Sequence, residues 1–174
     1  PHSDAWYWSI SLFHNRYENM IDFIYAIPVL SINREGVTGM GGEFQFKWKP
    51  IDTLTFRGSY AYLDMTDRGG APILYRSKHR GQVNVRYQAA LVNIQLGIQA
   101  WSKQIYEDFL SGSHFDFPIR ELPERIIPEL ILSREVNGFT GSLHITNLFD
   151  TKYELIQDFP MPGRSWQFNL TKTL

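Results

Sequence analysis

The sequence predicts an all-β protein that forms a transmembrane antiparallel β-barrel, and three observations lead to this prediction. Apolar and polar residues alternate with a period of two nearly everywhere, whereas helical spacing never persists. Many of the expected strands run for about 11–20 residues, and strands of soluble proteins usually run for about 3–10. The connections alternate in length, with short turns expected at one end and long loops at the other, which is the arrangement of outer-membrane barrels.

About eight strands are expected from the period-two segments. They cover about 6–25, 30–49, 54–66, 74–89, 92–107, 125–136, 139–147 and 164–174. The short connections are 50–53, 90–91 and 137–138, and the longer ones are 26–29, 67–73, 108–124 and 149–163. Asn137-Gly138 is a strong type I′ hairpin signal, because both positions of that turn need positive φ. In 18–25 the apolar residues change parity, and we interpret this change as a bulge that exchanges the two faces of the first strand.

The two faces of these strands differ in chemistry. One face is aromatic or branched and is expected to contact lipid or to form interfacial girdles; its aromatic members are Trp6, Trp8, Phe44, Phe46, Trp48, Tyr60, Tyr62, Trp166 and Phe168. The opposite face would line a wet or filled lumen; its members are Glu43, Gln45, Lys47, Arg57, Gln82, Asn84, Arg86 and Gln95. Because the bilayer core offers backbone groups no water, such strands must close into a ring without edges.

Composition narrows the class of protein further. The chain has 174 residues, which is one domain's worth by length, and its formal net charge is -1. Basic and acidic residues are balanced without a basic block, so no nucleic-acid partner is indicated. The chain contains no Cys, which excludes disulfides and thiolate metal sites. No apolar run approaches the roughly 18–20 residues of a membrane helix, whereas barrel strands are only half apolar and remain compatible with this composition.

The stretch from His144 to Leu174 begins as a strand, breaks at Asn-Leu-Phe-Asp and resumes after Gly-Arg. It resembles the C-terminal end of the TonB-dependent outer-membrane receptors, in which an Asn-Leu-Phe-Asp/Asn-x-x-Tyr motif and a Pro/Ala-Gly-Arg precede the last strand. The matching residues, for which a structural role is expected, are Asn147, Leu148, Phe149, Asp150, Tyr153, Pro162, Gly163 and Arg164. The segments 32–50 (INREGVTGMGGEFQFKWKP) and 74–87 (LYRSKHRGQVNVRY) are also similar to the family, so the resemblance to the cobalamin and siderophore receptors covers essentially the whole chain. The chain departs from the family at Lys172 and Leu174, where Tyr and Phe are common.

The resemblance implies a barrel of about 22 strands with a plugged lumen. Residues 1–174 would be the C-terminal third of it, and the plug domain would be absent from this chain. An N-terminus without Met or a signal sequence fits a mature protein or a piece of a longer one. The implied function is active uptake of a scarce nutrient, such as an iron siderophore, haem or cobalamin, across the bacterial outer membrane. The implied partners are the remainder of the barrel and its plug, the TonB-ExbB-ExbD energy system, outer-membrane lipid and lipopolysaccharide, and the nutrient itself.

Substrate in such receptors binds at the extracellular loops and the upper barrel wall. The long loops of this chain therefore carry the candidates, which are Arg68, Tyr75, Arg76, Tyr106, His114, Phe115, Asp116 and Arg120. His114 and Asp116 would touch a metal-bound ligand. Arg68, Tyr75 and Arg76 would meet an anionic siderophore or a phosphate. The alternative for all of them is a hydrated loop or a contact with lipopolysaccharide.

No catalytic residue, metal-ligand set or cofactor is expected. The five His residues are scattered without ligand spacing, and none stands out as a haem ligand. Two carboxylate pairs, Glu107 with Asp108 and Glu121 with Glu124, lie in a long loop, and nothing in the sequence indicates the burial and matched pKa values that a catalytic dyad needs. Because no Gly-rich phosphate loop opens a helix, nucleotide hydrolysis is not indicated, and energy would come from the TonB partner.

Two other folds could use the same strands. Eight strands can close on themselves, which would give a stand-alone outer-membrane barrel with a structural or adhesive role. A soluble ligand-carrying barrel would turn its apolar faces inward and expose charged residues such as Glu43, Lys47, Arg57 and Arg86. The family motifs argue against the first alternative, and the long strands and unequal loops argue against the second.

Overall fold

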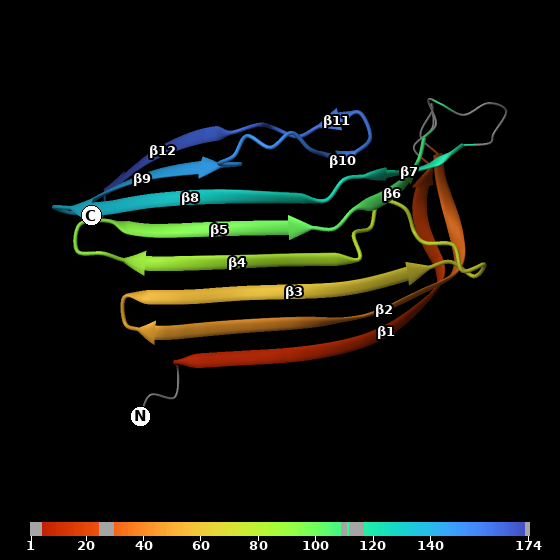
Figure 1. The fold of residues 1–174 in the computed structure, drawn as a ribbon, viewed down its shortest axis with the longest axis horizontal. Coiled ribbons are helices and arrows are strands. Elements are labelled where there is room, and N and C mark those ends of the chain that lie inside the picture. Colours follow the sequence, from red (N-terminus) through yellow and green to blue (C-terminus); the bar gives the residue numbers. More distant parts are fainter. Residues whose placement is uncertain (1–4, 25–29, 109–110, 112–116, 173–174) are drawn as a thin grey trace.

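The computed structural model describes residues 5–24, 30–108, 111 and 117–172, and these residues form an all-β structure. Eight antiparallel strands make one sheet in the order β1-β2-β3-β4-β5-β8-β9-β12 (Figure 1). Their bounds are β1 (Trp6–Ile24), β2 (Leu30–Ile51), β3 (Leu54–Thr66), β4 (His79–Gln88), β5 (Asn93–Trp101), β8 (Arg125–Val136), β9 (Phe139–Thr146) and β12 (Ser165–Lys172). This part of the chain contains no helix that is long and apolar enough to cross a membrane.

The eight expected strands are confirmed, but two of them are shorter than predicted. The fourth begins at His79 rather than at residue 74, because Tyr75 has a φ of 54°, which a strand cannot accommodate. The fifth ends at Trp101, and the chain then leaves the sheet to form β6 (Gln104–Glu107), which pairs with β7 (Ile119–Leu122). A second small hairpin, β10 (Glu154–Ile156) with β11 (Phe159–Pro160), occupies the connection between β9 and β12. The long loops are therefore partly ordered by their own pairing.

The turn between β8 and β9 has the predicted geometry, whereas the predicted bulge in β1 is wrong. Asn137 and Gly138 have φ values of 52° and 75°, as a type I′ turn requires. The pairing of β1 with β2 runs from Trp6 opposite Trp48 to Ile24 opposite Leu30 without a shift of register. A barrel strand crosses a bilayer with about 9–11 residues, whereas β1 and β2 have 19 and 22. The outer halves of β1 and β2 therefore extend beyond the bilayer. Apolar residues can lie on either face of the sheet there, because lipid no longer covers one face.

The register places residues of like character side by side across the sheet. One row crosses all eight strands and consists of Trp6, Trp48, Phe56, Val85, Leu96, Leu130, Ile145 and Trp166. The row of opposite parity contains Tyr7, Lys47, Arg57, Asn84, Gly97 and Glu129. We call these two sides of the sheet the apolar face and the polar face. All nine aromatic residues predicted to face lipid belong to the apolar face by this register.

Close packing around Phe46 on the apolar face depends on a glycine. A Cβ atom at Gly58 would lie 2.3 Å from Cε1 of Phe46, so the phenyl ring extends across the bare backbone of the neighbouring strand. Beside it, the rings of Trp48 and Phe56 stack with their centroids 5.2 Å apart. Cross-strand aromatic pairs of this kind are a main source of sheet stability.

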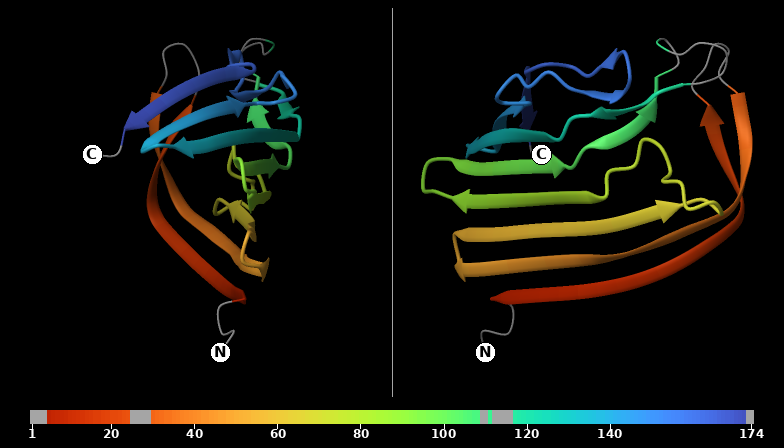
Figure 2. Two further views of the ribbon diagram at one scale, coloured as in Figure 1. Left: turned by 90° about the vertical axis from the view of Figure 1, so that its left-hand side faces the viewer. Right: turned by 45° about the vertical axis from the view of Figure 1, so that its right-hand side comes forward.

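The sheet is an open, curved wall (Figure 2). β1 and β12 are its two edges and do not pair with each other in the described residues, so a closed eight-stranded barrel is not formed by them. No second layer covers the apolar face in the part of the chain that the structure describes, and side chains such as Leu12 and Phe168 are 83% and 76% exposed. Some of the buried apolar side chains lie in the long connections and their hairpins, as Ile73, Tyr106 and Leu122 do, and the others lie on strands of the sheet, as Val37, Ile127 and Ile145 do.

Candidate functional site

The long connections gather at one end of the sheet, and the three short turns lie at the other (Figure 1). The long-loop end contains the outer parts of β1 and β2, residues 67–78, the β6–β7 hairpin and the β10–β11 hairpin. This arrangement is the predicted one, and it brings together segments that are far apart in the sequence. We call the contacts between these connections the loop-end cluster, and they form the candidate site.

Tyr75 and Tyr106 are two predicted site residues that the fold brings together. The Tyr75 backbone N–H donates to the Ile105 carbonyl over 2.8 Å, and the Gln104 side chain donates to the Tyr75 carbonyl over 3.0 Å. The two phenol rings stack with their centroids 6.1 Å apart. Burial raises the pKa of Tyr106 above its ordinary value, and the carboxylate of Asp108 raises it further. The Tyr106 phenol is therefore a neutral group at physiological pH.

Asp108, directly after β6, is a buried acceptor in the loop-end cluster. Its side chain is almost fully buried and lies 2.7 Å from Nε of Arg120. It accepts hydrogen bonds from the backbone and hydroxyl of Ser111 over 3.2 and 2.5 Å, and from the Gln157 amide over 3.1 Å. Because Gln157 belongs to the turn between β10 and β11, Asp108 ties the two small hairpins together. The candidate substrate-binding residue Arg120 is thus already engaged by a carboxylate of its own chain.

Arg125 is a buried residue of the cluster to which the sequence analysis assigned no role. Only 4% of Arg125 is exposed. Its guanidinium lies 4.9 Å from the ring centroid of Trp101 and 6.0 Å from that of Tyr153, and it donates to the Gln104 side-chain oxygen over 3.2 Å. Cation–π contacts of this kind stabilise a cation that lacks a carboxylate. Only the register of β5 with β8, which places Trp101 opposite Arg125, could have revealed this contact.

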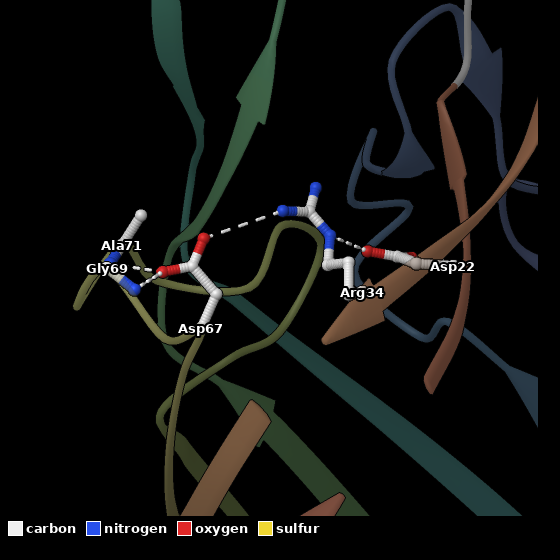
Figure 3. A network of polar contacts seen from close by, with 5 residues as sticks. All are labelled: Asp22, Arg34, Asp67, Gly69 and Ala71. Atoms are coloured by element: carbon white, nitrogen blue, oxygen red, sulfur yellow. Dashed lines mark hydrogen bonds and ion pairs between the residues drawn. The ribbon is translucent and has the colours of Figure 1, made fainter. Parts of the chain in front are cut away.

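The outer part of the β1–β2 hairpin is joined to the β3–β4 connection by a polar network (Figure 3). Arg34 donates from Nε to Asp22 over 2.6 Å, and its Nη1 lies 3.8 Å from the Asp67 carboxylate. The other oxygen of Asp67 accepts from the backbone N–H groups of Gly69 and Ala71, both over 2.9 Å. This network holds the connection that carries Arg68 against β2.

The remaining predicted site residues fall into two groups. The side chains of Arg68 and Arg76 are exposed, and the guanidinium of Arg76 makes one long hydrogen bond of 3.4 Å to the Tyr75 carbonyl. His114, Phe115 and Asp116 lie outside the described residues. The described residues contain no group of three or more His, Cys, Asp or Glu side chains that could hold a metal ion.

The C-terminal motif is built around a buried asparagine with a φ of 50°. The Asn147 amide donates to the carbonyls of Thr151 and Pro162 over 2.9 and 3.3 Å and accepts from the Thr151 N–H over 2.9 Å. Asp150 accepts from the Arg164 N–H over 2.7 Å, and a Cβ atom at Gly163 would lie 2.5 Å from that carboxylate. The motif thus joins both ends of the connection between β9 and β12, which is what a structural role requires.

The other motif residues lie around this centre. The Leu148 N–H donates to the Pro128 carbonyl of β8 over 2.9 Å, and Tyr153 lies beside Arg125. Phe149 is largely exposed. The motif therefore contributes one residue, Tyr153, to the loop-end cluster.

Comparison with known proteins supports the architecture. Residues 2–120 match the family model described as TonB dependent receptor-like, beta-barrel. Among solved structures, the ferripyoverdine receptor of the outer membrane of Pseudomonas aeruginosa superposes with a TM-score of 0.76 at 13% identity over 96% of this chain and 25% of that chain. The siderophore receptor PirA from Acinetobacter baumannii gives 0.76 at 13% identity over 97% and 30%, and the copper transporter OprC gives 0.74 at 15% over 97% and 28%. The chain spans less than a third of the length of these structures.

Proposed function

Because this chain belongs to the TonB-dependent receptor-like β-barrel family, we propose that it is a wall segment of a receptor for active nutrient uptake. Proteins of this family lie in the outer membrane of Gram-negative bacteria, and so does this chain. One observation carries the proposal: the described strands form an open sheet with one continuous apolar face and one polar face. A sheet of this kind is stable when lipid covers its apolar face and the polar face is turned inward.

The proposal assigns residues 1–174 to the C-terminal part of the receptor barrel. Further strands would pair with the edges β1 and β12, because open edges are not tolerated in the bilayer. A plug domain would fill the lumen against the polar face, and the TonB-ExbB-ExbD system would supply the energy. The long-loop end would face the outside, where lipopolysaccharide and the nutrient are met.

The substrate class that we propose is a ferric siderophore or another metal complex. The similar structures include a ferripyoverdine receptor, a siderophore receptor and a copper transporter. Within the loop-end cluster, Arg68 and Arg76 are exposed and form no ion pair with the described residues, whereas Lys78, Lys103 and Arg120 are paired with carboxylates. Arg125 is buried among aromatic rings. Arg68 and Arg76 are therefore the side chains proposed to meet an anionic complex.

Uptake by the whole receptor tests this function. Cells that rely on the receptor would be offered radiolabelled iron on a panel of siderophores, together with copper, haem and cobalamin, in the presence and absence of TonB. We expect TonB-dependent accumulation of one of these substrates, and an Arg76→Ala receptor with a several-fold higher KM but a similar maximal rate. Lys103→Ala is the matched control, since it removes an exposed cation that is paired with Glu121 over 2.6 Å. Accumulation that is independent of TonB for every substrate would contradict the proposal.

A further inference from the structure

Three strands at the C-terminal edge of the sheet carry two cations on their apolar face, close to the short-turn end. The register that places Leu130, Ile145 and Trp166 on this face also places Arg134 of β8 and Lys172 of β12 there. Both cations are exposed, and every other apolar-face residue within the described bounds of β8, β9 and β12 is uncharged. A charge on the lipid side is costly at the bilayer midplane but costs little near an interface. These two positions therefore indicate where the apolar face reaches the border of the bilayer.

Beside the two cations, the apolar face is hollowed over Gly141 of β9. Gly141 lies directly opposite Arg134 on one side and Leu170 on the other. A Cβ atom at Gly141 would meet nothing within 4 Å, so the space above this residue is open. The hollow measures about 440 Å³, enough for several methylene groups, and Arg134 stands at its border. Its apolar lining comes from Leu132, Leu143, Phe168 and Leu170.

The described chain supplies no anion for these cations. In the part that the structure describes, neither Arg134 nor Lys172 forms an ion pair. The Nζ atom of Lys172 lies 5.5 Å from the ring centroid of Phe139, which is on the same face. A ring face orients an ammonium group but carries no net charge that would neutralise it. The hollow is thus an apolar surface with two unneutralised cations at its edge.

We propose that this hollow binds one phospholipid of net negative charge, of the phosphatidylglycerol kind. The short-turn end faces the periplasm in the function proposed above, on which this inference rests, so the lipid belongs to the periplasmic leaflet. Its phosphate would lie at Arg134 and Lys172, and an acyl chain would cover Gly141. An amphiphile is the occupant that carries an anionic group directly beside an apolar chain, and a guanidinium binds phosphate in a two-bonded geometry.

Two observations narrow the proposal. A zwitterionic phosphatidylethanolamine fits less well, because its own ammonium group would be repelled by the two cations. Lys172 is also one of the positions where the chain departs from the family that it resembles, in which Tyr is common there. The site is therefore a property of this chain, and Lys172→Tyr is a substitution that the barrel should tolerate.

Photolabelling of the whole receptor in lipid vesicles tests the site. The vesicles consist of phosphatidylethanolamine with a trace of phosphatidylglycerol that carries a photoreactive acyl chain, and mass spectrometry gives the labelled residues. We expect labelling of 132–143 and 166–172 to exceed labelling of 46–56, which lies at the same end of the sheet on β2 and β3. The ratio of the two corrects for the amount of assembled receptor. The ratio should fall when phosphatidylethanolamine carries the photoreactive chain instead.

The variants separate the charges from the hollow. Arg134→Gln with Lys172→Tyr removes both cations, and the ratio should fall by roughly 25-fold, because each interfacial cation adds about fivefold to the affinity for an anionic lipid. Gly141→Leu keeps both cations and fills the hollow without a clash, and the ratio should fall several-fold. Arg134→Lys conserves the charge and should lower the ratio only slightly. Val83→Leu is the matched control for added bulk, since it lies on the apolar face of β4, away from the hollow.

The outcomes separate this inference from the proposed function. Equal ratios with the two lipid probes, or a ratio that survives the removal of both cations, would refute the site even in a receptor that transports. A site that is labelled as expected in a receptor without TonB-dependent uptake would support the inference and count against the function alone. Absence of labelling from all of these segments would mean that the apolar face does not meet lipid, and would overturn both.

Discussion

The wall and the loop-end cluster are stabilised in different ways. The wall is one layer deep in the described residues, and large side chains of its apolar face are exposed at both edges of the sheet, as Trp6 and Trp166 are. The loop-end cluster buries polar groups, such as Asp108 and Arg125, among partners from distant connections. The wall therefore depends for its stability on whatever covers its apolar face, whereas the cluster depends on contacts made within the chain.

The largest expected effect concerns the apolar face. Phe46→Arg should cost about 2–4 kcal/mol of the free energy of unfolding of the receptor in lipid, because a charge near the bilayer midplane is desolvated. Gln45→Arg, one residue away on the polar face, should cost little. Denaturant unfolding of both variants in lipid vesicles measures the difference. Equal destabilisation by the two changes would mean that the apolar face does not contact lipid.

A smaller effect is expected in the loop-end cluster. Asp108→Ala removes the acceptor of the Ser111 and Gln157 hydrogen bonds, and should cost about 1–3 kcal/mol of local stability. Hydrogen exchange should show faster opening of 104–122 and 154–160, with the wall unaffected. Glu121→Ala is the control, since its exposed ion pair with Lys103 contributes about 0–1 kcal/mol. Faster exchange throughout the sheet would show that the cluster and the wall are not independent.

The smallest effect is a pH dependence that appears only in alkali. Since burial raises the pKa of Tyr106 above the ordinary 10.0, the folded state keeps the phenol proton to a higher pH than the unfolded state does. The favourable contribution of the buried phenol is therefore complete below the ordinary pKa and is lost as the pH rises above it. Ultraviolet difference titration of the receptor against a Tyr106→Phe variant should give a midpoint above that of free tyrosine. A midpoint at or below 10.0 would show that Tyr106 is exposed or unpaired with Asp108.

The wall is the part that could be predicted from the sequence, because each strand carries its own period-two pattern. The order of the sheet follows from short turns such as Asn137-Gly138, which leave consecutive strands no choice but to pair. The predicted bulge in β1 was wrong. The apolar residues of 18–25 do change from one face of the strand to the other, but the backbone pairing with β2 continues without a shift of register. In the outer halves of these long strands, the face on which the apolar residues lie does not reveal whether the backbone contains a bulge.

The contacts of the loop-end cluster could be seen only in the tertiary structure. Nothing local in the sequence relates Asp108 to Gln157, or Arg125 to Tyr153, because these contacts join segments whose relative position depends on the register of whole strands. Likewise, Lys47 and Arg57 become opposed only once β2 and β3 are paired. The sequence by itself determined the strands, their two faces and the family, since these depend on residues close together along the chain. Contacts between distant residues depend on the pairing register of the strands, which sets the distances over which charges and hydrogen-bonding groups interact.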